Sequence, residues 1–173
     1  ATGHHIVFAA GTGVLCFVDL VAELCKFNIS QTNNLGSSIN SEGKFDDSTD
    51  QVQIDSENFQ LHLYVSFPRR SDSVALELFE ALDAYCKRAQ KNFFHLHVRL
   101  SQEKVNPGRW DERFIQQEVS KFGFKSIQKV WVCGPPVMNE TFDRVFSGQA
   151  PAGNGDQLLG NDRLLQPNQY EIL

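Results

Sequence analysis

Short apolar segments typical of β-strands alternate with segments of helical period from one end of the chain to the other. The strand-like segments are residues 5–10, 59–67, 93–100, 127–133 and 170–173. The segments with apolar residues three or four positions apart are residues 14–27, 73–90, 111–122 and 137–146. Because alternating strands and helices return each strand to a parallel neighbour, this order predicts an α/β protein. We expect a three-layer α/β/α sandwich with a mainly parallel five-stranded sheet, in one domain covering residues 1–173.

Residues 28–58 interrupt this order. They are rich in Ser, Asn, Asp and Gln without sustained periodicity, which indicates a disordered acidic surface insertion, with a regulatory or partner-binding loop as the alternative. The segment holds six acidic side chains against one lysine, and the whole chain has a net charge of −5. The insertion therefore carries the entire net charge, and the rest of the chain is neutral enough to bind a phosphate-bearing ligand.

Several classes of protein do not fit this composition. The longest apolar run, residues 6–18, is broken by Gly11, Thr12 and Gly13, so no segment reaches the roughly 20 residues that span a bilayer. A net negative chain without a basic run argues against nucleic-acid binding. The four cysteines form neither a CxxC motif nor a cluster with histidines, so we expect reduced thiols and no metal site. The nucleophile elbow of hydrolases and the P-loop of NTPases are both missing from the sequence.

Two glycine-containing motifs follow expected strands, at the edge of a parallel sheet where ligands bind. Gly11 and Gly13 come directly after the first strand, where they allow backbone N–H groups to approach a phosphate at a helix start. Cys16 replaces the third glycine of the dinucleotide-binding pattern, so tight strand–helix packing explains this motif equally well. Cys133 and Gly134 precede a proline pair, which ends a strand and opens a helix. We expect Cys133 to face the ligand crevice; a buried structural cysteine is the alternative.

The two motifs in this order resemble the pyridine-nucleotide domain of the ferredoxin–NADP⁺ reductase superfamily, which includes flavin-dependent nitrate reductases, ferric reductases and NADPH oxidases. The resemblance covers nearly the whole chain apart from residues 28–58 and the Gly-rich tail, and it implies a Rossmann-like nucleotide-binding fold. Residues 106–111, Asn-Pro-Gly-Arg-Trp-Asp, are similar to the Gly-Arg-Trp segment of the ferric reductase and NADPH oxidase branch. The residues that carry the resemblance are Ala10-Gly11-Thr12-Gly13-Val14 and Val132-Cys133-Gly134-Pro135-Pro136, followed by Met138.

The resemblance implies a site that binds NAD(P)H beside a flavin. Cys133, as the candidate catalytic residue, and Gly134 would border the nicotinamide, whose C4 passes a hydride to N5 of FAD or FMN. The cofactors carry the redox chemistry, so the protein supplies position and electrostatics. The pyrophosphate would lie on Gly11, Thr12, Gly13 and Val14. The wall beside the nicotinamide would consist of Pro135, Pro136 and Met138.

Two departures from the family bear on nucleotide binding. Family members commonly have Thr-Pro where this chain has Leu15-Cys16, which implies the loss of a hydroxyl contact and of a preset first helical turn. Members that select NADPH often place Ser-Arg after the third strand, where this chain has Ser101-Gln102, a pair that favours NAD.

Arginines near the strand ends keep the choice between NADP and NAD open. Arg69 and Arg70 follow the second strand and could hold a 2′-phosphate instead, with Arg99 nearby. Two arginines ahead of a helix are equally consistent with a solvated surface.

In this superfamily an antiparallel barrel that binds FAD or FMN precedes the nucleotide domain, and no such sequence precedes Ala1. We therefore expect an excised NAD(P)H-binding domain of a flavin-dependent reductase, inactive without the flavin domain of the same parent chain. Its expected location is cytoplasmic, or the cytoplasmic part of a membrane-embedded parent, without membrane contact of its own. The alternative is a degenerate nucleotide-fold module that serves as a protein-interaction or regulatory domain, which Leu15-Cys16 and the insertion would favour.

Overall fold

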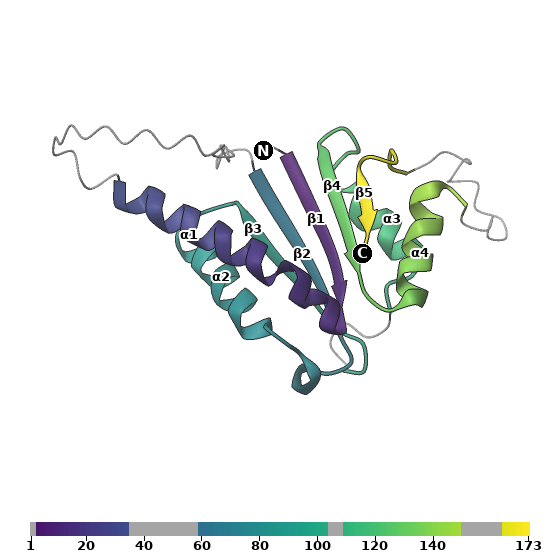
Figure 1. The fold of residues 1–173 in the computed structure, drawn as a ribbon, viewed down its shortest axis with the longest axis horizontal. Helices are drawn as coiled ribbons and strands as arrows, with labels where there is room; N and C mark the ends of the chain where they lie inside the picture. The colour runs from purple at the N-terminus through teal and green to yellow at the C-terminus, as the bar shows by residue number, and fades with distance from the viewer. Residues whose placement is uncertain (1–2, 35–58, 104–108, 150–163) are drawn as a thin grey trace.

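The computed structural model describes residues 3–34, 59–103, 109–149 and 164–173. Its centre is a parallel five-stranded sheet with the strand order β3-β2-β1-β4-β5 (Figure 1). The strands are β1 (Gly3–Ala10), β2 (Phe59–Phe67), β3 (Phe94–Leu100), β4 (Ile127–Cys133) and β5 (Tyr170–Ile172). The helices are α1 (Val18–Asn34), α2 (Leu76–Arg88), α3 (Glu112–Ser120) and α4 (Pro136–Ser147), with short 3₁₀ helices η1 (Gly11–Phe17) and η2 (Arg70–Asp72). The α/β class and the Rossmann-like arrangement predicted from the sequence are confirmed.

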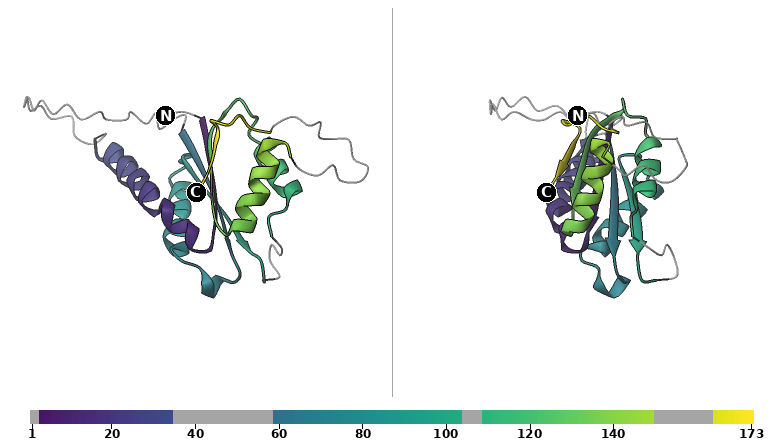
Figure 2. Two further views of the ribbon diagram at one scale, coloured as in Figure 1. Left: turned by 45° about the vertical axis from the view of Figure 1, so that its right-hand side comes forward. Right: turned by 90° about the vertical axis from the view of Figure 1, so that its right-hand side faces the viewer.

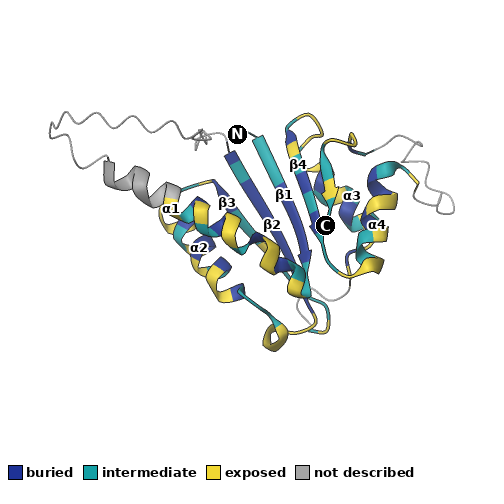
Figure 3. Cartoon of the chain, in the orientation of Figure 1, coloured by how far each residue is buried: buried dark blue, intermediate teal, exposed yellow. Residues whose placement is uncertain are grey.

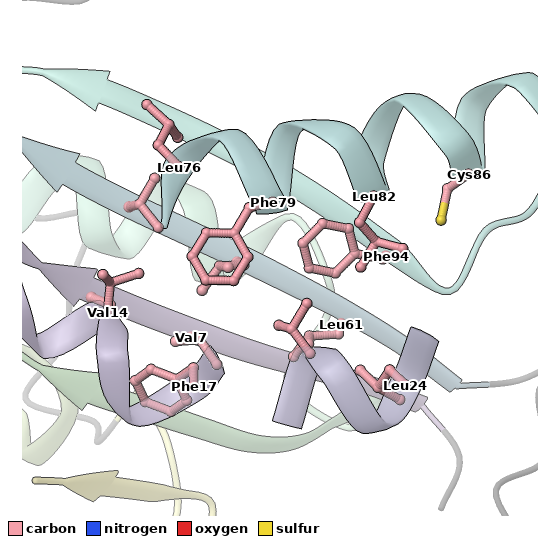
Figure 4. Close-up of a cluster of buried hydrophobic side chains, with 14 of the residues drawn as sticks. Val7, Val14, Phe17, Leu24, Leu61, Leu76, Phe79, Leu82, Cys86 and Phe94 are labelled. Carbon is pink, nitrogen blue, oxygen red and sulfur yellow. The ribbon is translucent and has the colours of Figure 1, made fainter. Parts of the chain in front are cut away.

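Helices cover both faces of the sheet, α1 and α2 on one and α3 and α4 on the other (Figures 1 and 2). Successive residues of β1 alternate between the two faces, so Val7 packs under α1 and α2 whereas Phe8 packs under α4. Figure 4 shows the first of these cores, in which Phe17 from η1 and Phe79 from α2 cover the strands. Burying each such phenylalanine contributes about 1.5–3 kcal/mol, which binds the helical layers to the sheet.

Burial follows position in the sheet (Figure 3). Ile6, Val7 and Phe8 of the central strand β1 are fully buried, because both faces and both edges of that strand are covered. This explains why β1 is a continuous apolar run instead of an alternating one. β3 forms one edge of the sheet and is only partly buried beyond Phe94.

The strands at 59–67 and 127–133 match the prediction residue for residue, whereas β1 begins earlier, at Gly3. Gly3 and His4 escaped the sequence pattern because neither is apolar, although both pair with neighbouring strands. The expected helix over residues 14–27 is a 3₁₀ helix up to Phe17 and then continues as α1 to Asn34, past the predicted end. The insertion predicted over 28–58 is therefore helical at its start, and residues 35–58 lie outside the described part of the chain.

The starts of α3 and α2 differ in how they are capped. Asp111 caps α3, since its carboxylate accepts a 2.7 Å hydrogen bond from the backbone N–H of Phe114. The helix predicted from residue 73 begins later, at Leu76 of α2, after Ala75 takes a left-handed φ of 57°. Asp72 lies before it in η2.

None of the helices among the described residues is both long enough and apolar enough to cross a membrane.

Candidate functional site

The carboxyl ends of the strands lie along one edge of the sheet, the lower edge in Figure 1. At this edge β1 and β4 are neighbours, with Ala9 paired to Cys133. After β1 the chain passes through η1 into the layer of α1 and α2, whereas after β4 it enters α4 in the opposite layer. Ligands of open α/β sheets bind at such a switch point, where adjacent strands send the chain to opposite faces. The two motifs singled out in the sequence flank this point.

Gly13 packs directly against the backbone of Cys133. A β-carbon on Gly13 would collide with the carbonyl oxygen of Cys133 and would lie 2.8 Å from its carbonyl carbon and 3.1 Å from its Sγ. Only glycine fits this contact. Tight packing, which the sequence left open as an explanation for the glycine motif, is therefore present at Gly13. The contact brings the glycine loop and the Cys-Gly-Pro-Pro turn together although their residues are far apart in the chain.

Gly134 is enclosed from two sides. A β-carbon there would lie 2.6 Å from Sδ of Met138 and 3.3 Å from Cβ of Ala10. The sequence predicts that Gly134 borders a ligand. On the side where a β-carbon would point, however, the Met138 thioether fills the space. A flexible methionine end can move aside, whereas the backbone of Cys133 beside Gly13 cannot.

The other predicted loop residues differ in exposure. Gly11 takes a left-handed φ of 57°, and Thr12 beside it is exposed. Val14 is fully buried in the core under α1 and α2, so it can meet a ligand only through its backbone. Pro135 and Pro136 are exposed at the start of α4. The first N–H groups of a helix have no acceptor within the helix, so the start of η1 presents donors at this edge.

The thiols of Cys16 and Cys133 face each other, with 3.6 Å between their Sγ atoms. Both cysteines are free; Cys16 is exposed, whereas Cys133 is half-buried. Burial, followed by the hydrogen bond with Cys16, raises the pKa of Cys133 to about 11. Cys133 is therefore a neutral thiol at pH 7, which suits a residue that borders a nicotinamide without acting as an acid or base.

A second group of predicted residues lies at the ends of β2 and β3. The backbone N–H groups of Ser101 and Gln102 donate to the carbonyls of Phe67 and Pro68, both at 2.9 Å, so the two strand ends are joined. This group lies along the same edge of the sheet as the glycine loop, with β1 adjacent to β2.

The arginines after β2 occupy different settings. Arg70 forms a bidentate ion pair with Glu80 of α2, with N–O distances of 2.7 and 2.8 Å, and its backbone N–H donates to Glu103. A 2′-phosphate would have to compete with the Glu80 carboxylate for this guanidinium. Arg69 is exposed and precedes η2.

A pocket of about 510 Å³ lies between β2, β3 and α3, and the sequence did not point to it. Arg99 stands over the ring of Phe114, with 4.6 Å from Cζ to the ring centre. The Tyr64 hydroxyl donates to Glu118 at 3.0 Å, and burial raises the pKa of Tyr64, so the hydroxyl stays protonated. Polar and aromatic residues occupy every second position on the paired strands β2 and β3, and this alternation was the signal that the sequence offered for the pocket. These residues are His62, Tyr64, His95, His97 and Arg99. The pocket is lined by Tyr64, His97, Val98, Arg99, Trp110, Phe114, Glu118 and Lys121.

Comparisons with known proteins rest on structure alone. No protein-family model matches the chain, and no curated protein matches it either. The solved structure of the CS-b5R domains of human Ncb5or in the NAD⁺ form is similar, with a TM-score of 0.57 and 16% sequence identity. The match covers 99% of this chain and 36% of that chain.

At this level of identity the likeness shows that the chain shares the fold of that structure. The resemblance drawn from the sequence is thus confirmed at the level of the fold. In this fold, the glycine loop after β1 and the Cys-Gly-Pro-Pro turn after β4 occupy neighbouring strand ends. Trp110, from the segment similar to the oxidase branch, is buried against Phe8 and Phe142, and the part of that segment before residue 109 lies outside the described residues.

Within the described parts of the chain, no group of three or more His, Cys, Asp or Glu side chains is arranged to hold a metal ion.

Proposed function

We propose that this chain is the NAD(P)H-binding domain of a flavin-dependent oxidoreductase. The observation that carries the proposal is the contact of Gly13 with the Cys133 backbone, which joins the two motifs at the switch point of the sheet. A dinucleotide with its pyrophosphate on residues 11–14 would then have its nicotinamide next to Cys133 and Gly134. The neutral body of the chain adds no repulsion against the two phosphates.

The adenosine half would extend along the ends of β2 and β3. Ser101 and Gln102 present hydroxyl and amide groups there, which suit a ribose, and Arg69 is the exposed cation for a 2′-phosphate. Arg70 is held by Glu80, so we infer a preference for NADH over NADPH.

The surroundings of the proposed nicotinamide site fit a flavin domain as neighbour. Leu15 is 52% exposed and Val137 is 65% exposed, and they adjoin Cys16 and Met138 in the chain. A flavin domain placed on this edge of the sheet would cover both of these exposed side chains. A bound flavin would supply hydride acceptance and one-electron transfer, while this chain positions the nucleotide.

Thr12→Glu tests the site directly. Thr12 is exposed, so the variant should fold, but its carboxylate would lie where the pyrophosphate binds and would weaken NADH binding by at least about tenfold, or about 1.4 kcal/mol. The matched control is Gln128→Glu, which adds the same charge at the exposed start of β4, on the opposite edge of the sheet. Calorimetric titration of the wild type and both variants with NADH and NADPH provides the measurement.

Two outcomes would contradict the proposal. If the wild type shows no saturable binding at millimolar nucleotide, the interaction-module alternative is favoured instead. If the chain steadily reduces ferricyanide with NADH and no added flavin, the dependence on a flavin domain is wrong.

A further inference from the structure

Two cysteines from distant parts of the chain meet at the carboxyl edge of the sheet. Cys16 lies in η1 and Cys133 ends β4, 117 positions apart, yet their Sγ atoms are 3.6 Å from each other. Each is a free thiol. A sulfur–sulfur bond is about 2.0 Å long, so the two sulfurs need to approach by only about 1.5 Å.

The fold itself sets this approach. The backbone of Gly13, three residues before Cys16, packs on the backbone of Cys133, and Ala9 pairs with Cys133 across the sheet. The thiols are therefore held near each other by backbone contacts and a sheet ladder. The Cys16 side chain is exposed and has room to rotate towards Cys133.

The other two cysteines offer a contrast within the same chain. Cys86 is 1% exposed in the core under α1 and α2, where burial raises its pKa to about 11. Burial also raises the pKa of the half-exposed Cys25 thiol on α1. Of the four thiols only Cys16 is exposed, so a reagent in solution reaches it first, and Cys133 is the thiol beside it at 3.6 Å. Oxidation is thus expected to join Cys16 and Cys133.

We propose that Cys16 and Cys133 form a redox-active dithiol, which a small-molecule disulfide converts into an intrachain disulfide across the nucleotide site. The Cys16 thiolate attacks one sulfur of the small-molecule disulfide and expels the first thiolate, leaving a mixed disulfide on Cys16. The Cys133 thiolate then attacks Sγ of Cys16 and expels the second thiolate. The two protein thiols lose two electrons, the reagent gains them, and the two protein protons end on the two released thiols.

The order of the two attacks follows from exposure. Cys16 is reached from solution, whereas Cys133 is half-buried and its raised pKa leaves little thiolate at neutral pH. Cys16 therefore reacts first and Cys133 resolves. Because the second step uses the weakly populated thiolate, closure of the disulfide should accelerate about tenfold per pH unit below the pKa of Cys133.

The consequence for nucleotide binding rests on the proposed function. A disulfide would tie η1 to the end of β4 across the place assigned to the nicotinamide, and its sulfurs would stand where the ring lies. The oxidised chain should bind NADH at least about tenfold more weakly than the reduced chain. Bound nucleotide should in turn slow the oxidation.

Oxidation in a glutathione buffer tests the pair. The purified chain is equilibrated with oxidised glutathione, quenched in acid, alkylated and mapped by mass spectrometry. We expect a peptide linked between Cys16 and Cys133, with Cys25 and Cys86 still alkylated. Cys133→Ser should stop at a glutathione adduct on Cys16, and Cys16→Ser should leave Cys133 alkylated. Cys25→Ser is the matched control and should form the disulfide as the wild type does.

The results separate the proposed pair from the proposed function. A chain that keeps four alkylated thiols in excess oxidised glutathione, or that links other cysteines, overturns the dithiol. A Cys16–Cys133 disulfide whose formation leaves NADH affinity unchanged overturns the effect on nucleotide binding. A reduced chain that forms the disulfide readily but binds no nucleotide supports the dithiol and overturns the proposed function.

Discussion

At the scale of single residues, two glycines at the proposed site are held by contacts of different stiffness. Gly13 faces the carbonyl group of Cys133. Cys133 belongs to β4, which is paired on both sides in the sheet, so its backbone cannot shift away from Gly13. Gly134 faces the end of the Met138 side chain, which has rotatable bonds and can turn away. The same substitution to alanine should therefore have unequal effects at the two positions.

Gly13→Ala should destabilise the chain by about 3 kcal/mol, because overpacking against backbone forces strand and loop apart. Gly134→Ala should destabilise it by about 1 kcal/mol, because Met138 yields. Neither position has a left-handed φ, so the difference reports crowding alone. Urea unfolding of both variants measures it, and equal destabilisation, or a larger effect at Gly134, would show that the contact between the two motifs is soft.

At the scale of elements, the three paired strands β1, β2 and β3 bring four histidines together on the α3 side of the sheet. His62 of β2 is 7% exposed; its Nε2 lies 3.2 Å from Nδ1 of His4 on β1, and its ring stacks on His95 of β3. Burial, together with the charges of His95, His4 and His97, lowers the pKa of His62 to about 3. The folded state thus holds this imidazole neutral, whereas the unfolded chain protonates it near pH 6.5.

The sheet should therefore lose stability in acid. Above pH 6.5 the unfolded chain also keeps His62 neutral, so His62 does not change the free energy of unfolding there. Between pH 6.5 and 3, each pH unit of acidification lowers the free energy of unfolding by up to about 1.4 kcal/mol. At pH 5 the loss from His62 should reach about 2 kcal/mol. Urea unfolding of the wild type and His62→Phe at pH 7.5 and pH 5 should show a smaller loss in the variant.

His95→Gln is the matched control for this prediction. Burial is the first cause of the lowered pKa of His62, and His95 is the second, so removing His95 should leave most of the acid sensitivity in place. If His95→Gln abolishes the sensitivity as fully as His62→Phe, then charge repulsion, and not burial, controls this group.

At the scale of the whole molecule, a neutral folded body is joined to an acidic segment. The sequence places six acidic residues and one lysine between α1 and β2, in residues 35–58, outside the described part of the chain. Both flanking elements pack into the core under α1 and α2 through residues of their own, such as Leu24 and Leu61. We therefore expect the body to fold and bind nucleotide without the segment.

Replacing residues 35–58 by about 12 Gly and Ser residues should change the stability by less than about 1 kcal/mol, because loop-closure entropy varies slowly with length. NADH affinity should stay within about threefold of the wild type, and the net charge should become zero. Thermal unfolding and calorimetric titration measure both effects. A collapse of either quantity would favour the regulatory or partner-binding alternative for the segment.

The sequence by itself determined the order of elements and the class of the fold. Strands 59–67 and 127–133 could be predicted to the residue, because each is a run of continuous or alternating apolar residues. Each run also ends sharply, before Pro68 and before Gly134. It also singled out the two motifs at the switch point, because glycine and proline act through local backbone geometry. Starts that depend on neighbours were missed, as at β1, where Gly3 and His4 gain strand structure by pairing.

Only the tertiary structure decided which residues meet. That Gly13 must be glycine because of Cys133, and that Cys16 and Cys133 bring their thiols to 3.6 Å, follows from the adjacency of β1 and β4, which no local pattern records. The ion pair of Arg70 with Glu80 has the same origin. Local sequence sets backbone preference and the buried face, whereas strand order is set by how whole layers pack, and strand order determines what stands at the proposed nucleotide site.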